Sequence, residues 1–249
     1  MTLKGVILAG GTGSRLKPLT SATNKHLLPV YNKPMIFYPI EALKSAGITD
    51  ILVITGTHHA GAIFQLLGSG KSLGVKFTYR VQDEAGGIPS AIALAEDFVG
   101  NSRFVSVNGD NIVFESLAPF AKEFGKSREE MQILLYRGTN EEAMKSGVAV
   151  TNGNKVTEVV EKPKEPPSNN IIIGIYFMSP SVFDVIRAIK PSARGETEIT
   201  DVQRHYLEKN SLRAEFLKDK WLDAGDFEDL LHANLETKKI CDEGKNQFC

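Results

Sequence analysis

Cations and glycines near the start of the chain have the types and spacing needed to bind phosphate groups. The segment from Leu3 to Pro29 reads LKGVILAGGTGSRLKPLTSATNKHLLP, and no Asp or Glu occurs before Glu41. Glycines leave backbone N–H groups open to an anion, while Arg15 and Lys25 supply positive charge. A polyphosphate is therefore the expected ligand, although a simple structural turn would also explain the glycines.

Two better-known phosphate-binding motifs do not fit this loop. A dinucleotide fingerprint needs a third glycine where Leu16 stands and an acidic residue about 20 positions later, and the sequence has neither. The Gly-Lys-Ser/Thr ending of a P-loop is also absent from the segment. A nicotinamide-dependent dehydrogenase is therefore disfavoured.

Two acidic residues later in the chain could hold a metal ion. Asp110 follows the apolar run 104–108, at the expected carboxyl end of a central strand, where ligands of open α/β sheets bind. We expect Asp223 to share a metal with Asp110, because Mg2+ bound to substrate phosphates commonly takes one or two protein carboxylates. Asp226 is expected instead to cap the last helix.

Gln82 and Gly87 lie in a loop that could contact a pyrimidine base. A glutamine amide offers a donor and an acceptor, and glycine would let the base approach the backbone. An ordinary polar loop is the alternative interpretation. His58 and His59 are not expected to form a metal pair, because adjacent side chains on a helix point in different directions.

The elements that would position these residues alternate along the chain. Strands are predicted at 5–9, 51–55, 75–81, 104–108, 132–136, 171–178 and 212–216, and helices at 34–43, from His58 to Leu67, from Pro89, at 198–208 and at 228–240. This alternation predicts an α/β fold with a mostly parallel, Rossmann-like sheet between two layers of helices. The turn Asn152-Gly153-Asn154 adds a small β-hairpin.

Several motifs together resemble those of the sugar-1-phosphate nucleotidyltransferases, most closely the glucose-1-phosphate thymidylyltransferase branch in its short form. The motifs are LAGGTGSRLKPLT, NKHLLPV, VQDEAGGI, NGDN, SGVAV, VVEKPKEP, ARGETEITD and WLDAGD, in the same order as in the family. They cover nearly the whole chain. The resemblance implies the nucleotide-diphospho-sugar transferase fold, in which the hairpin is an insertion that binds the sugar.

The resemblance also implies an activity and roles for particular residues. The reaction would be Mg2+-dependent transfer of a nucleotidyl group from dTTP to glucose 1-phosphate, giving dTDP-glucose and pyrophosphate. Catalysis would fall to Arg15, Lys25 and Lys162. Nucleotide binding would fall to Leu8, Gly10, Gly11, Thr12, Gly13, Gln82, Gly87 and Asp110. Sugar-phosphate binding would fall to Asn111, Gly147, Glu161, Lys162 and Arg194, and metal binding to Asp110 and Asp223.

Some alternatives stay open beside this interpretation. Glu161 and Lys162 could be a solvated ion pair at the end of a strand. A UTP-dependent uridylyltransferase is the nearest other enzyme, because uracil lacks only one methyl group of thymine. A non-catalytic protein that binds nucleotide sugars is another alternative. Ser90 and Ile173 depart from the pattern of many relatives, so the preferred base and sugar stay open.

The composition limits the partners and the location. The 249 residues are expected to form a single domain, with residues 1–130 mainly binding the nucleotide, 131–225 mainly binding the sugar phosphate, and 226–249 forming a helix and tail. A net charge of -1 argues against nucleic-acid or membrane-surface binding. Cys241 and Cys249 lack metal-site spacing and are expected to be reduced thiols. The apolar run 171–178 is too short to span a bilayer. We expect a cytoplasmic protein, and homo-oligomer formation stays open.

Overall fold

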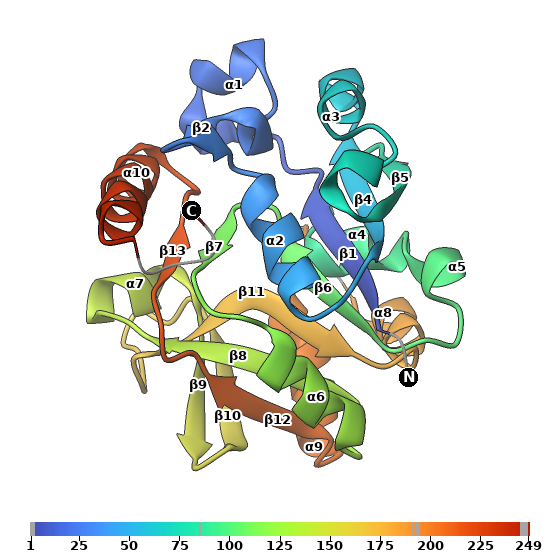
Figure 1. Ribbon diagram of the computed structural model, residues 1–249. Coiled ribbons are helices and arrows are strands. Elements are labelled where there is room, and N and C mark those ends of the chain that lie inside the picture. Colours follow the sequence, from blue (N-terminus) through green and yellow to red (C-terminus); the bar gives the residue numbers. More distant parts are fainter. Residues whose placement is uncertain (1–2, 85, 191, 193–194, 245–248) are drawn as a thin grey trace. The chain divides into compact units, whose positions relative to one another are not determined.

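The protein is described by a computed structural model that covers residues 3–84, 86–190, 192, 195–244 and 249 (Figure 1). These residues divide into two compact units. The glycine-loop unit comprises Gly5–Ala85, Val107–Leu117 and Asp219–Cys249, and the hairpin unit comprises Met1–Lys4, Gly86–Ser106 and Ala118–Lys218. Residues 86–106 group with the later strands, and residues 219–249 group with the first ones. The division of binding roles at residues 130 and 225 stays a prediction.

Three parallel strands form the centre of the glycine-loop unit. They are β1 (Lys4–Ala9), β4 (Asp50–Gly56) and β5 (Lys76–Gln82), in the order β5-β4-β1. Strands β4 and β5 lie side by side in Figure 1. The runs 6–9 and 51–55 are buried throughout, which is the pattern of a parallel strand covered on both faces. These strands lie where the sequence predicts them.

Helices α2 (Phe37–Ser45) and α3 (Ala60–Leu67) connect these strands. Helix α2 starts three residues later than predicted, because Lys33–Pro34 forms β3 and pairs with β2 (Pro29–Val30). Helix α2 ends before Gly47, whose φ of 72° provides the left-handed conformation expected after a helix. The shorter helices of this unit are η1 (Ser14–Leu16), α1 (Leu19–Ala22), η2 (Lys25–Leu27) and η3 (Lys71–Leu73).

A short antiparallel pair and the last helix complete the glycine-loop unit. Strand β7 (Asn111–Val113) pairs with β13 (Trp221–Asp223), and neither strand was predicted. Helix α10 (Phe227–Asp242) lies beside β13 (Figure 1). Asp226 Oδ1 accepts a hydrogen bond from the Asp229 N–H at 3.0 Å, which confirms the predicted cap. The core under α10 contains Val30, Met35, Tyr38, Ile112, Phe114, Leu222, Ala224 and Ala233.

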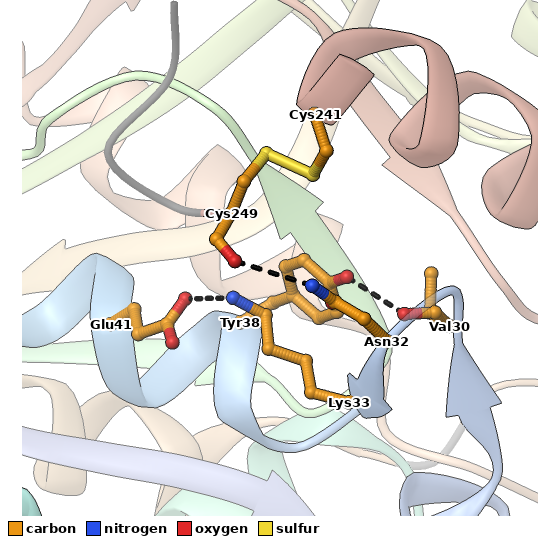
Figure 2. Close-up of a disulfide and its surroundings, with 7 residues drawn as sticks. All are labelled: Val30, Asn32, Lys33, Tyr38, Glu41, Cys241 and Cys249. Atoms are coloured by element: carbon orange, nitrogen blue, oxygen red, sulfur yellow. Dashed lines mark hydrogen bonds and ion pairs between the residues drawn. A yellow bond between two sulfur atoms is a disulfide. The ribbon is translucent and has the colours of Figure 1, made fainter. Parts of the chain in front are cut away.

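The two cysteines form a disulfide, so the prediction of reduced thiols is wrong. Cys241, in the last turn of α10, bonds to Cys249 across a sequence separation of eight residues (Figure 2). The carbonyl of Cys249 accepts a hydrogen bond from Asn32 Nδ2 at 3.2 Å, beside the ion pair of Lys33 with Glu41. Neither the residue spacing nor the expected compartment indicates that Cys249 lies beside the end of α10.

The hairpin unit contains a mixed sheet. Its strands are the first part of β6 (Phe104–Asn108), of which residues 107–108 belong to the glycine-loop unit, and all of β8 (Met131–Arg137), β9 (Gly147–Asn152), β10 (Lys155–Glu161), β11 (Asn170–Met178) and β12 (Leu212–Phe216). Their order is β6-β11-β8-β12-β10-β9. Strands β8 and β12 are parallel, whereas β8 with β11, β10 with β12 and β9 with β10 are antiparallel. The turn that joins β9 to β10 confirms the predicted hairpin, with Gly153 at φ 60°.

Six helices are described in the hairpin unit. They are α4 (Ile88–Ala93), α5 (Glu96–Val99), α6 (Ala118–Lys126), α7 (Asn140–Lys145), α8 (Val182–Ala188) and α9 (Ile199–Glu208). Helix α7 was not predicted from its charged sequence, but a capping box between Thr139 and Glu142 starts it. Strands and helices in both units confirm the α/β class. Within the described ranges, no helix combines the length and apolarity that crossing a bilayer would require.

Candidate active site

The glycine loop of residues 10–13 follows β1 and requires glycine for two different reasons. Gly13 has φ 63°, and a Cβ added there would lie 2.7 Å from Thr20 Cγ2. A Cβ added at Gly10 would lie 2.5 Å from Gln82 Oε1, so this glycine allows the Gln82 side chain to approach the backbone. The conformation of the loop and the closeness of Gln82 are therefore both set by missing side chains.

A cavity of about 440 Å³ opens beside this loop within the glycine-loop unit. Its lining residues are Gly10, Gly11, Thr12, Lys17, Thr20, Ser21, Thr23, Asn24, Gly56, Thr57, His58, His59, Gln82 and Asp83. The cavity brings predicted phosphate-binding and base-binding residues together around one space. Its size is in the range of small-molecule sites.

Lys25 and Asp110 form an ion pair next to the glycine loop, with 13% and 14% of their side chains exposed. A Cβ added at Gly11 would lie 3.9 Å from Lys25 Nζ, so the ammonium group is close to the loop as well. Burial alone would raise the pKa of Asp110, but the positive charge of Lys25 outweighs it and holds this pKa below its usual range. Asp110 is therefore a carboxylate at neutral pH.

Asn24 and His26 flank Lys25 in the sequence and are hydrogen-bonded to each other. Asn24 Oδ1 accepts hydrogen bonds from the His26 N–H at 2.9 Å and from His26 Nδ1 at 2.7 Å. The Gly109 N–H donates to the Leu8 carbonyl at 2.9 Å, which fixes the loop that carries Asp110 to the end of β1. Asn24 and His26 were not predicted as site residues. The sequence feature that could have indicated them is their position on either side of Lys25.

Asp223 lies near Asp110 because β7 and β13 pair. The register of that pair places Asp223 opposite Asn111, the residue that follows Asp110. Burial, and next the negative charge of Asp110, raise the pKa of Asp223 to about 7. The two carboxylates are thus close enough to repel each other, and they are a donor set that suits a hard cation with other ligands from substrate or water. The described residues include no cluster of three or more metal-ligating side chains.

Arg15 also reaches this group of acids. A Cβ added at Gly225 would lie 3.0 Å from Arg15 Nη2 and 3.2 Å from Asp223 Oδ2. Gly225 therefore leaves room for the guanidinium and the carboxylate to come close together. The glycine loop, its two cations and the two acids form one connected group within the glycine-loop unit.

Asn111 supports Asp110 through its side-chain amide. Asn111 Nδ2 donates to Asp110 Oδ1 at 3.3 Å, and Asn111 Oδ1 accepts from Trp221 Nε1 at 2.8 Å. Both ends of the buried amide are engaged in these contacts. The role of Asn111 in sugar-phosphate binding stays a prediction, and its position indicates that it orients Asp110.

A second cavity, of about 430 Å³, lies in the hairpin unit. Register places Glu161 opposite Gly147 in the β9–β10 pair, and a Cβ added at Gly147 would lie 3.5 Å from Glu161 Oε2. Lys162 follows with φ 41°, an uncommon conformation for a side chain other than glycine, and its Nζ lies 3.5 Å from Glu161 Oε1. The cavity is lined by Glu161, Lys162, Ser192, Glu198, Thr200, Asp201 and Arg204.

Five residues of this cavity were not predicted as site residues: Ser192, Glu198, Thr200, Asp201 and Arg204. Thr200 Oγ1 is buried and has no hydrogen-bond partner among the described residues, so it could bind a ligand hydroxyl group. Arg204 is held by Asp201 at 2.5 Å and by the Val159 carbonyl at 3.2 Å. These residues lie on or just before α9, where polar side chains are indistinguishable in sequence from a solvated helix face.

The structure gives a separate local explanation for three further residues that the sequence singled out. Gly87 has φ 91°, and a Cβ there would collide with the Thr197 carbonyl oxygen, so packing alone requires this glycine. Ser90 Oγ donates to the Gly86 carbonyl at 2.8 Å, which closes the loop before α4. Ile173 is fully buried in β11 and offers no polar group. Arg194 lies outside the described residues.

We expect Gly87→Ala to destabilise the fold strongly. Gly87 has φ 91° and ψ 173°, a conformation that essentially only glycine adopts and that costs about 1–3 kcal/mol for a residue with a Cβ. The collision with Thr197 adds to this cost. Gly153→Ala is the matched control, because Gly153 has φ 60° but nothing within 4 Å of its added Cβ. Urea unfolding should show a larger loss of unfolding free energy for Gly87→Ala. Equal losses for the two variants would contradict the packing argument.

His26 should make the protein less stable in acid. Burial, and next the charge of Lys25, lower the pKa of His26 to about 3, whereas the unfolded chain has the ordinary value of 6.5. Below pH 6.5 the unfolded state binds a proton that the folded state does not, so stability falls with pH by at most about 1.4 kcal/mol per pH unit. Above pH 6.5 this contribution is absent.

The comparison that isolates His26 is urea unfolding of wild type and His26→Gln between pH 7 and pH 4. The variant should lose less stability on acidification than wild type does. His232→Gln, at an exposed position of α10, should behave as wild type. Parallel curves for wild type and His26→Gln would contradict a depressed pKa.

The chain is similar to known proteins over most of its length. Residues 4–240 match the family model described as nucleotidyl transferase. The chain is 42% identical over 247 residues to the low-salt glycan biosynthesis nucleotidyltransferase of Haloferax volcanii, covering 97% of this chain and 69% of that protein. It is 40% identical over 235 residues to a glucose-1-phosphate thymidylyltransferase of Neisseria meningitidis, covering 93% and 81%.

A solved structure is also similar. It is a crystal structure of a protein assigned as a glucose-1-phosphate thymidylyltransferase from Bacillus anthracis, in complex with sucrose. The TM-score is 0.90 at 47% identity, and the match covers 95% of this chain and 96% of that one. Sequence and structure therefore point to the same group of proteins.

Proposed function

Because the chain belongs to the nucleotidyl transferase family, we propose that it transfers a thymidylyl group from dTTP to glucose 1-phosphate, with release of pyrophosphate and formation of dTDP-glucose. The observation that carries this proposal is the grouping of Arg15, Lys25, Asp110 and Asp223 next to the glycine loop. Cations that face a phosphate-binding loop, with two acids beside them, suit a nucleoside triphosphate and its metal ion.

The nucleotide binds in the cavity beside the glycine loop. Backbone N–H groups of the loop and the side chains of Arg15 and Lys25 bind the triphosphate, where their charge reduces repulsion as the α-phosphorus is attacked. Gln82 lines the same cavity and contacts the edge of the base with its amide. Thr12, which also lines the cavity, contributes its hydroxyl group.

Asp110 and Asp223 would hold the divalent metal ion that enzymes of this family generally require. We assign Mg2+, because both ligands are carboxylates and the substrate supplies phosphate oxygens. When bound, the ion neutralises charge on the phosphates. Lys25 then keeps Asp110 ionised, and Asn111 holds the carboxylate of Asp110 in orientation.

The sugar 1-phosphate binds in the hairpin-unit cavity. Glu161 accepts hydrogen bonds from sugar hydroxyl groups, Gly147 leaves room for the ring, and Lys162 binds the phosphate. Arg194 is assigned a second contact to that phosphate. The phosphate oxygen is already an anion at neutral pH, so its attack on the α-phosphorus requires positioning and charge neutralisation rather than a general base.

The test is pyrophosphate release with Mg2+, using dTTP, UTP, CTP, ATP and GTP against glucose 1-phosphate and other sugar 1-phosphates. Turnover should be highest with dTTP and glucose 1-phosphate. UTP should also react, because one methyl contact contributes only about 1–3 kcal/mol. A clear preference for UTP would move the assignment to a uridylyltransferase. No release with any pair, from folded protein, would favour a non-catalytic binding protein.

A further inference from the structure

A third cavity, of about 420 Å³, lies in the hairpin unit, and the proposed function does not use it. It is lined by residues of β10 and β12, which lie side by side in Figure 1, by the end of α9 and by the segment before β8. It shares no lining residue with the second cavity. Strand β10 runs from Lys155 at the third cavity to Glu161 at the second, so the two cavities lie about 20 Å apart along this strand.

Arg213, which lines the third cavity, has N–H groups that the protein leaves unpaired. Its side chain is only 20% exposed, and a guanidinium carries five N–H donors. Among the described residues only Glu215 accepts a hydrogen bond from it, through Nη2. Arg213 Nε is buried and has no hydrogen-bond partner in that part of the chain. Because a buried donor without an acceptor is costly, an acceptor supplied by a ligand would stabilise this side chain.

Lys155 places a second positive charge beside Arg213. The two residues are direct partners in the antiparallel register of β10 and β12, so their side chains project from the same face of the sheet. Lys155 forms no ion pair within the described ranges. Like charges at directly opposite positions destabilise a sheet. An anion bound between the two side chains would replace this repulsion with two attractions.

Asn154 and Glu215 fix the guanidinium of Arg213 before any ligand binds. Asn154 Nδ2 donates to Glu215 Oε1 at 2.9 Å, and the same oxygen accepts from Arg213 Nη2. Glu215 is therefore held from two sides while it pairs with the guanidinium. A preformed arrangement of this kind lowers the entropy cost of binding.

The rest of the lining suits a ligand that carries hydroxyl groups. Glu129 supplies carboxylate oxygens that accept hydrogen bonds, and Asn210 supplies an amide that both donates and accepts. Val156, Leu207 and Leu212 add apolar surface. Glu129 would repel a ligand that is negatively charged along its whole length, so only one end of the ligand should be anionic.

We propose that the third cavity binds a small hydroxylated anion. Its single phosphate or carboxylate group lies between Arg213 and Lys155, and its hydroxyl groups bind Glu129 and Asn210. The cavity volume is in the range of small-molecule sites, so an anion of hexose size fits it. Because the second cavity is about 20 Å away, this ligand is not the sugar 1-phosphate that reacts.

Calorimetric titration of the full chain, without Mg2+ or nucleotide, tests the proposal with four probes. These are glucose 6-phosphate, gluconate, glucose and orthophosphate. At least one of the two hydroxylated anions should bind, and the tighter one identifies the anionic group. Glucose lacks the charge and orthophosphate lacks the polyol, so both should bind at least about 10-fold more weakly. No binding of either hydroxylated anion, or equally tight binding of glucose or orthophosphate, would overturn the proposal.

Substitutions identify the residues that hold the anion. Lys155→Glu should weaken binding at least about 10-fold, because it replaces attraction with repulsion. Lys209→Glu is the matched control, since Lys209 is an exposed lysine next to Asn210 that does not line the cavity. Arg213→Gln should also weaken binding, and its far-UV spectrum and urea unfolding show whether the variant is folded. Equal effects of Lys155→Glu and Lys209→Glu would contradict the proposed site.

The last experiment separates the third cavity from the second. Lys162→Met should bind the anion as wild type does, because Lys162 follows the far end of β10. Acetylation with acetic anhydride, read by mass spectrometry, locates the anion directly. The bound anion should protect Lys155 and leave Lys162 and Lys209 reactive. Protection of Lys162 instead of Lys155, or loss of binding in Lys162→Met, would place the anion in the second cavity and overturn the proposal.

Discussion

Asp110→Asn is expected to lower turnover with dTTP and glucose 1-phosphate by about 10²- to 10³-fold, the effect of removing one well-placed electrostatic group. The substitution keeps the size of the side chain but removes the negative charge that pairs with Lys25 and faces Asp223. Binding of a divalent ion should weaken as well. The concentration of Mg2+ required for half-maximal rate should therefore increase.

Three comparisons make this result specific. Asp219→Asn changes an exposed aspartate of the same unit and should leave turnover unchanged. Asp223→Asn should cause a loss similar to that of Asp110→Asn, and the double variant should lose little more, because both carboxylates act on one ion. The thermal unfolding temperature of Asp110→Asn shows whether the protein is still folded when Lys25 has lost its ion-pair partner Asp110. Full turnover by folded Asp110→Asn protein would contradict the assigned role.

Lys162→Met is expected to lower kcat/KM for glucose 1-phosphate by about 10²- to 10³-fold, because one cation that binds the reacting phosphate is removed. Methionine keeps much of the length and apolar stem of lysine, so the change is mainly one of charge. Lys162 lines the cavity of the hairpin unit. The KM for dTTP should therefore change much less than the KM for the sugar phosphate.

The control for this prediction is Lys155→Met, at the other end of the same strand β10. Initial rates with each substrate varied in turn would separate the two KM values. Equal increases in both would indicate a general disturbance rather than the loss of a phosphate contact. Unchanged kinetics in folded Lys162→Met protein would remove Lys162 from the site and leave the solvated ion pair as its explanation.

Local patterns predicted most of the secondary structure. Apolar runs such as 51–55 predicted parallel strands, and the Asn-Gly turn at 152–153 predicted a hairpin. Both predictions were possible because these features depend on residues close in sequence. The cap formed by Asp226 was predicted for the same reason. The α/β class, the family and the reaction class follow from the motifs taken together.

Features that depend on distant residues could not be predicted in this way. The pairing of β7 with β13 brings Asp223 to Asp110, and three-residue strands have no reliable sequence signal. The contact of Gly87 with Thr197 joins residues far apart in the chain. The disulfide of Cys241 with Cys249 depends on where the tail returns to α10. The assignment of Asp223 to the metal therefore rested on the ligands that Mg2+ prefers and not on periodicity.

The most direct test of the central claim follows the phosphorus atoms of the nucleotide. Two parallel reactions with Mg2+ and glucose 1-phosphate would use dTTP labelled at the α-phosphorus or at the γ-phosphorus. Nucleotidyl transfer predicts that the α label enters dTDP-glucose and that the γ label is released as pyrophosphate. Recovery of the α label only as dTMP or dTDP, or of the γ label as orthophosphate, would contradict the proposed reaction.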